Sequence, residues 1–117
     1  MCAKKTITRI DEFNQGLVEE NRLPVLLACI SKDDDLEWVI HILEHVGQRL
    51  WSRIEIFLAI DDLVPFFMEK YGFEGTPSYI LIQKGMPPEY MFGDISEDDL
   101  FRFTGQNLIN NVARGKP

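Results

Sequence analysis

The sequence predicts an α/β fold in which a central mixed β-sheet is flanked by helices. Short continuous apolar runs alternate along the chain with stretches whose apolar residues recur every three or four positions. This alternation gives the element order β-α-β-α-β-α-β-β-α, which is typical of layered α/β folds. A chain of 117 residues fits one ordinary domain. We therefore expect a single domain over residues 1–117, with its core at about 11–108.

The first part of the chain predicts two strands and a helix. Residues 5–10 are interpreted as a short edge strand. Asp11 follows as the N-cap of a helix over 12–20, because its carboxylate can accept from free N–H groups at a helix start. Residues 25–30 form a continuous apolar run, typical of a strand covered on both faces.

The next segment is an amphipathic helix that leads into another buried strand. Ser31 or Asp33 is expected to cap the helix, which runs from about residue 34 to 51. Its core-facing stripe has apolar side chains at helical spacing, namely Leu36, Val39, Leu43, Val46 and Leu50. Residues 53–60 are rich in Ile and Phe and predict a strand.

The rest of the chain predicts a helix, a hairpin and a last helix. The helix over 63–71 ends at Gly72, which suits a left-handed stop. A strand over 78–83, the turn Lys84-Gly85-Met86 and an antiparallel partner over 90–92 follow. Ser96 is expected to cap the final helix, which runs to about Ile109.

One stretch, residues 70–85 (KYGFEGTPSYILIQKG), resembles the thioredoxin family. The matching order is Tyr-Gly, a loop, Thr-Pro, an apolar strand and a Lys-Gly turn, one residue shorter than the Lys-x-Gly of the family. Gly93 resembles the glycine that closes the substrate groove of the family, and 96–108 resembles its last helix. The resemblance covers about 11–108. It implies a thioredoxin-like fold and a cis peptide bond before Pro77, beside which the backbone of Thr76 would pair with an extended peptide.

The chain departs from the family where thioredoxins carry Cys-Gly-Pro-Cys. Asp33-Asp34-Asp35-Leu36 stands there, and a shift by one residue brings in no cysteine. Leu27 replaces the buried aspartate of the family, and Lys32 its tryptophan. Because thiol exchange needs a thiolate and a second, resolving thiol, we expect no dithiol oxidoreductase activity. No catalytic residue, cofactor or metal is predicted.

The overall charge and the cysteine content narrow the partners further. The net charge is −7, from 19 acidic and 12 basic residues, which disfavours nucleic acid because its phosphates are bound by Lys and Arg. No apolar run is long enough for a membrane span, and no secretory signal is recognised. Two cysteines, Cys2 and Cys29, make no disulfide framework, so a cytoplasmic location is expected.

The candidate binding residues are Thr76, Pro77 and Gly93, with the acidic Asp33, Asp34 and Asp35 beside them. The three aspartates either cap the helix or form an acidic surface for a basic partner or a cation. Three consecutive carboxylates lack the loop that a calcium site requires. Cys29 is interpreted as a core residue, with a single-thiol active site as the alternative.

Glu37, His41 and His45 recur at every fourth position of the long helix, and two histidines at this spacing are a common zinc pair. They fall opposite the apolar stripe, so we interpret them as a solvated face. Phe66 and Phe67 cannot both face the same way on a short helix. Either one of them is exposed to a partner or a second subunit or, as we prefer, the helix lies between sheet and solvent with a wide apolar face. The other aromatic side chains considered are interpreted as mostly core, namely Phe73, Tyr79, Phe92, Trp38 and Trp51.

These observations favour a non-catalytic module that binds a protein or an extended peptide segment in the groove beside Thr76 and Pro77, as an adaptor or a chaperone-like subunit. Two alternatives stay open. One is a monothiol oxidoreductase that uses Cys29. The other is a structural domain that associates with a second copy of itself as a homodimer.

Overall fold

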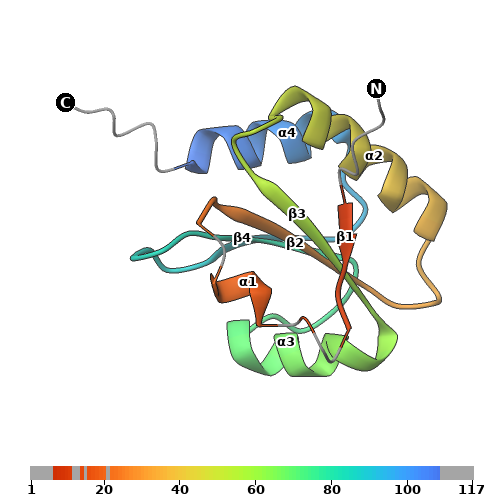
Figure 1. Ribbon diagram of the computed structural model, residues 1–117. Coiled ribbons are helices and arrows are strands. Elements are labelled where there is room, and N and C mark those ends of the chain that lie inside the picture. Colours follow the sequence, from red (N-terminus) through yellow and green to blue (C-terminus); the bar gives the residue numbers. More distant parts are fainter. Residues whose placement is uncertain (1–6, 12–13, 15, 21, 109–117) are drawn as a thin grey trace.

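The computed structural model describes residues 7–11, 14, 16–20 and 22–108, which build a five-stranded mixed sheet (Figure 1). The strands lie in the order β1-β3-β2-β4-β5. β1 and β2 both pair with β3 in parallel, whereas β4 is antiparallel to β2 and to β5. The strand bounds are β1 Ile7–Arg9, β2 Val25–Ile30, β3 Glu55–Ile60, β4 Ser78–Ile82 and β5 Glu89–Phe92. The predicted mixed sheet and its strand order along the chain are confirmed.

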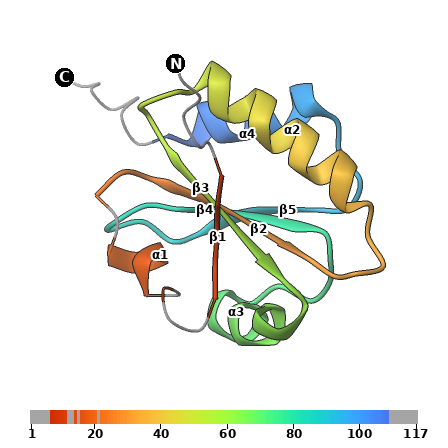
Figure 2. The same cartoon turned by 45° about the vertical axis from the view of Figure 1, so that its right-hand side comes forward.

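Helices cover both faces of the sheet, as Figures 1 and 2 show. α2 (Leu36–Arg49) and α4 (Glu97–Asn107) lie side by side on one face. α1 (Leu17–Glu20) and α3 (Val64–Tyr71) lie on the other, and the short 3-10 turn η1 (Asp61–Leu63) joins β3 to α3. None of the helices within the described ranges combines the length and apolarity needed to cross a bilayer.

The central strand β2 divides the core into two halves. All six of its side chains are buried, and they alternate between the two faces of the sheet. Leu26, Ala28 and Ile30 pack under α2 and α4, whereas Leu27 and Cys29 pack toward α3. The continuous apolar run therefore arises because this strand has a helical layer above and below it.

The long helix α2 confirms the predicted amphipathic pattern and corrects its start. Val39, Leu43 and Val46 are buried against the sheet, but Leu36 is exposed. Asp35, rather than Ser31 or Asp33, caps the helix, because its side chain accepts from the backbone N–H of Trp38 over 3.1 Å. Ser31 and Asp33 belong instead to the turn that precedes the helix, in which the N–H of Asp33 donates to Ser31 Oγ.

Of two other predicted helix ends, the one at Gly72 is confirmed and the one at Asp11 is wrong. Gly72 ends α3 with a φ of 82°, the left-handed stop that was predicted. Asp11 does not cap a described helix. It closes a turn with Asn14, in which each side-chain oxygen accepts from the backbone N–H of the other residue, at 3.1 and 2.7 Å. The first described helix begins only at Leu17, and residues 12, 13 and 15 of the predicted helix lie outside the described residues.

Candidate functional site

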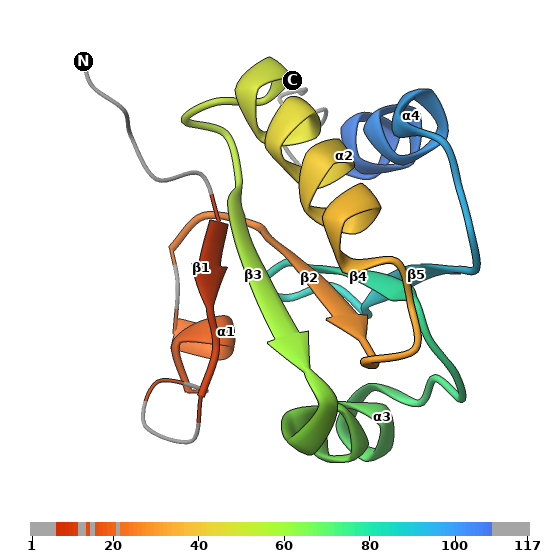
Figure 3. The same cartoon turned by 90° about the vertical axis from the view of Figure 1, so that its right-hand side faces the viewer.

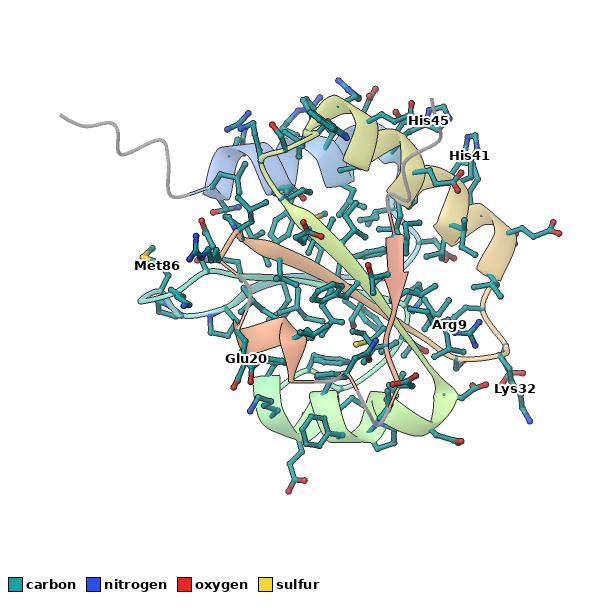
Figure 4. All side chains as sticks on the ribbon, viewed as in Figure 1. Arg9, Glu20, Lys32, His41, His45 and Met86 are labelled. Carbon is teal, nitrogen blue, oxygen red and sulfur yellow. The ribbon has the colours of Figure 1, made fainter. Side chains whose placement is uncertain are left out.

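The candidate site lies at the edge of the sheet where β2, β3 and β5 end and β4 begins (Figure 3). Parallel strands finish at the same edge of a sheet, and ligands of open α/β folds usually bind just beyond it. Lys32 marks this edge in Figure 4, whereas Met86, in the turn between β4 and β5, lies at the opposite end. The segments that meet here are 31–35, 61–63, 76–77 and 93–96.

The ledge of the site, which we define as Thr76, Pro77 and Gly93, joins two of these segments. The Thr76–Pro77 peptide bond is cis. The N–H of Gly93 donates to the carbonyl of Pro77 over 2.8 Å, and Gly93 has a φ of 102°, which glycine adopts far more readily than other residues. No other described residue makes a hydrogen bond to the backbone N–H or C=O of Thr76. The ledge thus offers backbone groups to which an extended chain can pair.

Carboxylates hold the segment before α2 in place, at the position where thioredoxins carry their cysteines. The backbone N–H of Ser31 donates to Asp34 Oδ2 over 2.8 Å. The next N–H, of Lys32, donates to Asp61 Oδ1 over 2.8 Å, which ties this segment to the end of β3. Asp61 has a φ of 55°, a left-handed conformation that aspartate tolerates better than most residues. The carboxylates therefore hold the segment 31–35 in place and also make it negatively charged.

The three consecutive aspartates have three different roles. Asp34 holds the turn, since its own N–H also donates to the carbonyl of Ser31. Asp35 caps α2. The side chain of Asp33 is exposed and makes no hydrogen bond or ion pair within the part of the chain that the structure describes. Asp33 is therefore the member of the trio whose carboxylate is available to a partner.

Carboxylates from different loops share this edge. Burial raises the pKa of Tyr79 well above its usual value, and the carboxylates of Asp94 and Asp34 raise it further, so both act on one phenol. Lys32 is the one basic residue in segments 31–35, 61–63 and 93–96. We call the acidic set the acidic rim, and its members are Asp33, Asp34, Asp61, Asp62 and Asp94.

Cys29 is opposite Ser78 in the β2–β4 pair, near the edge of the sheet that carries the site, but its side chain lies inside the molecule. Its side chain is fully buried in the core that faces α3, next to residues such as Phe67. Burial raises the pKa of the Cys29 thiol to about 12, so almost none of it is thiolate at neutral pH. Because the thiolate is the nucleophile in exchange chemistry, this position suits a packing role. The structure does not bring Cys29 to the start of α2.

An aromatic cavity of about 470 Å³ adjoins the ledge on the side of the sheet that α3 covers. Tyr90 and Phe92 project into it from the same face of β5, and they are 52% and 63% exposed. Ser78 and Gly75, which flank Thr76–Pro77 in the sequence, also line it, together with Gly72, Phe73 and Glu74. The Ser78 hydroxyl donates to the Gly75 carbonyl over 2.6 Å and fixes the loop between them.

The sequence interpretation missed this cavity because it assigned Phe92 to the core. Phe73 and Tyr79 are buried as predicted, but Phe92, Trp38 and Trp51 are exposed. Phe92 is exposed because β5 is an edge strand, and α3 packs against the central strand β2 without covering Phe92. Two aromatic residues at alternate positions of the predicted hairpin strand 90–92 were the available signal.

A mixed sheet of this order between two helical layers defines a thioredoxin-like fold. Among solved structures, the crystal structure of chloroplastic thioredoxin z is similar, with a TM-score of 0.71 over 90% of this chain and 96% of that one. The two sequences are 14% identical, so the similarity concerns the fold and leaves the chemistry to the site. No protein-family model matches the chain, and no curated protein matches its sequence.

Proposed function

We propose that this protein is a non-catalytic binding module that holds an extended, basic segment of a partner protein at the ledge. The observation that carries the proposal is the backbone of Thr76, two residues before β4 and next to Pro77, whose N–H and C=O have no hydrogen-bond partner among the described residues. Backbone groups without partners at the end of a strand are the usual means by which a sheet captures an extended peptide. A peptide bound here would extend from the ledge across the acidic rim.

The acidic rim supports the preference for a basic segment. The carboxylates of Asp34 and Asp61 are already fixed by backbone N–H groups, so a bound peptide need not order them. Asp33 adds an exposed carboxylate with no competing partner among the described residues. Lysine or arginine side chains that approach this edge would therefore gain electrostatic energy, and binding would weaken as salt screens these charges.

The aromatic cavity supports a second contact with the same segment. Successive side chains of an extended peptide point to opposite sides, so a basic residue over the rim can alternate with an apolar residue in the cavity. Phe92 and Tyr90 offer exposed aromatic surface there, and aromatic side chains at binding sites often carry a large share of the affinity. The proposed ligand pattern is therefore a basic residue next to an apolar residue.

Binding without exchange is supported by the position of the thiols. Cys2 and Cys29 are not spaced as a Cys-x-x-Cys motif, and Cys29 is buried with a raised pKa. Thioredoxin z, which shares the fold, is described by its type-specific target recognition. For the present chain we propose recognition alone, without reduction of the bound segment.

A selection from a random peptide display library tests the proposal. The wild-type protein is expected to enrich peptides in which Lys or Arg alternates with an apolar residue. Fluorescence anisotropy with a selected peptide should then show an affinity loss of about tenfold for Phe92→Ala, in line with an interface hot spot. Phe66→Ala is the matched control, because Phe66 is an exposed phenylalanine on α3 that does not line the cavity.

The charge contribution needs its own pair of variants. Asp33→Asn is expected to weaken peptide binding and to reduce its salt dependence, whereas Glu69→Gln, on exposed α3 surface, should change neither. Enriched peptides without a basic bias would rule out the acidic rim as a contact, and equal binding by Phe92→Ala and Phe66→Ala would rule out the aromatic cavity. Insulin reduction that is lost in Cys29→Ser would instead establish the single-thiol enzyme.

A further inference from the structure

Two histidines on the exposed side of α2 lie next to each other, as Figure 4 shows. His41 and His45 are one helical turn apart, and their ring centroids are separated by 4.3 Å with the ring planes tilted by 43°. Residues at this spacing project from the same face of a helix, which is why such pairs can bind one metal ion. Two ligands on one helix are not by themselves enough to hold an ion firmly, so a third donor is required.

The third donor comes from α4. Glu97 is the first residue of that helix, and its Oε1 lies 3.3 Å from His45 Nδ1. One ligand atom from each of His41, His45 and Glu97 can be chosen so that all lie within 4.8 Å of one another. In the sequence the acidic residue at the same spacing is Glu37, on the same helix, and the three residues were interpreted as a solvated face. The structure instead places Glu97 beside the histidines, because α2 and α4 pack side by side on one face of the sheet.

The distances suit a tetrahedral ion with small adjustments. Zinc binds imidazole nitrogen and carboxylate oxygen at about 2.0–2.2 Å, which places neighbouring tetrahedral ligands about 3.3 Å apart. His45 and Glu97 already have that separation. The widest separation of 4.8 Å has to close by about 1.5 Å, and the exposed His41 and His45 side chains have room to rotate.

The neighbours of the cluster orient its members. Arg49 Nη1 lies 3.6 Å from Oε2 of Glu97 and 3.3 Å from Oδ1 of Asp98, so the guanidinium occupies one oxygen of Glu97 and leaves Oε1 toward the histidines. The Arg49 side chain is itself placed over the ring of Phe101 at 3.6 Å. Support of this kind for a ligating carboxylate is a regular feature of metal sites.

From these contacts we infer that His41, His45 and Glu97 form a binding site for a zinc ion that links α2 to α4. Two imidazoles and one carboxylate are the donor set of a borderline metal such as Zn²⁺, whereas Ca²⁺ and Mg²⁺ prefer oxygen ligands. Three protein ligands leave the fourth coordination position to water or to a group from another molecule. This site is separate from the ledge and does not depend on the proposed peptide binding.

Isothermal titration of the tag-free protein with zinc chloride tests the inference. The expected result is one Zn²⁺ per chain, with affinity reduced by more than about tenfold in His41→Ala, His45→Ala and Glu97→Gln, since even an outer-shell partner contributes about 10- to 100-fold. Glu37→Gln is the matched control, because Glu37 lies on the same exposed helix but outside the cluster. The zinc affinity of Glu37→Gln should equal that of the wild type.

Trp38 offers a second readout. Its ring stacks on that of His41 at 5.6 Å between centroids, so a metal ion at His41 is expected to change Trp38 fluorescence. Zn²⁺ should give a saturable change that is lost in His41→Ala and in Trp38→Phe, whereas Mg²⁺ should give none. Weak, unsaturable zinc binding, or equal zinc binding by wild type and both histidine variants, would overturn the inference.

Discussion

The ring of Phe92 rests directly on Gly75: a Cβ atom added to this glycine would lie 2.6 Å from Cε1 of Phe92. This separation is too short for a real contact, so Gly75→Ala is expected to push the exposed ring away from the loop and reshape the aromatic cavity. The free energy of unfolding should fall by less than about 1 kcal/mol, because the end of the flexible Phe92 side chain can move. Chemical shifts of the Phe92 ring by NMR should change, and peptide affinity should fall.

Gly105→Ala provides the control for that change. Gly105 lies in α4, and outside the neighbouring residues and backbone of its own helix no described atom lies within 4 Å of an added Cβ, so alanine there should raise stability by about 0.5–1 kcal/mol through its helix propensity. The Phe92 ring shifts and the peptide affinity should stay at their wild-type values. If Gly75→Ala leaves the Phe92 shifts unchanged as well, the contact between these two residues is not as described.

The three consecutive aspartates should respond differently to mutation. Asp35→Ala removes the N-cap of α2 and should lower the free energy of unfolding by about 0.5–2 kcal/mol. Asp34→Ala leaves the half-buried backbone N–H of Ser31 without its carboxylate acceptor and should lower the free energy of unfolding by about 1–3 kcal/mol. Asp33→Ala should be neutral within about 0.5 kcal/mol. Urea unfolding of the three variants measures the order, and a large loss for Asp33→Ala would contradict the assigned roles.

Most strands and helices could be predicted, because a continuous apolar run or a helical spacing of apolar residues restricts how an element can pack. The apolar run of β2 required a helical layer on both sides, and the spacing in α2 placed Val39, Leu43 and Val46 in the core. The cap of α2 could not be chosen from the sequence, since several adjacent residues are able to cap. Tertiary contacts decided it: Asp61, from the end of β3, binds the N–H of Lys32 and leaves Asp35 to begin the helix.

The site was predicted in part, for a related reason. Thr76, Pro77 and Gly93 are brought together at one edge, where Gly93 donates to Pro77. The exposure of Phe92 depends on how far α3 extends over the sheet, and the partner of His45 is Glu97 from a distant helix. Neither relationship leaves a periodic signal, because both depend on packing between elements far apart in the chain.

The buried thiol of Cys29 makes stability sensitive to alkali. Its pKa is raised from 9.0 to about 12 by burial, so between these values the unfolded chain has released a proton that the folded chain retains. The unfolded state then binds fewer protons, and the free energy of unfolding falls by up to about 1.4 kcal/mol per pH unit over this window. Below pH 9 this contribution is fully present.

Urea unfolding at pH 8 and pH 10 in a Cys2→Ser background measures this effect. With Cys29→Ala added, the free energy of unfolding should fall less between the two pH values. The buried Tyr79 keeps its own contribution in both proteins. In the same background, a thiol reagent at pH 8 should label the folded protein far more slowly than the protein in urea. Equal labelling in both states would show that Cys29 is accessible and would revive the single-thiol activity.

Thr104 carries a hydroxyl that no described residue satisfies. Thr104 lies in α4 and is fully buried, and its Oγ1 has no hydrogen-bond partner among the described residues. Thr104→Val keeps the shape and removes the unpaired group, so the free energy of unfolding should rise by about 1 kcal/mol. Thr104→Ser keeps the hydroxyl and loses a methyl group, and should cost about 1 kcal/mol. Thermal unfolding of both variants distinguishes the two effects, and a destabilised Thr104→Val would mean that the hydroxyl has a partner in solution.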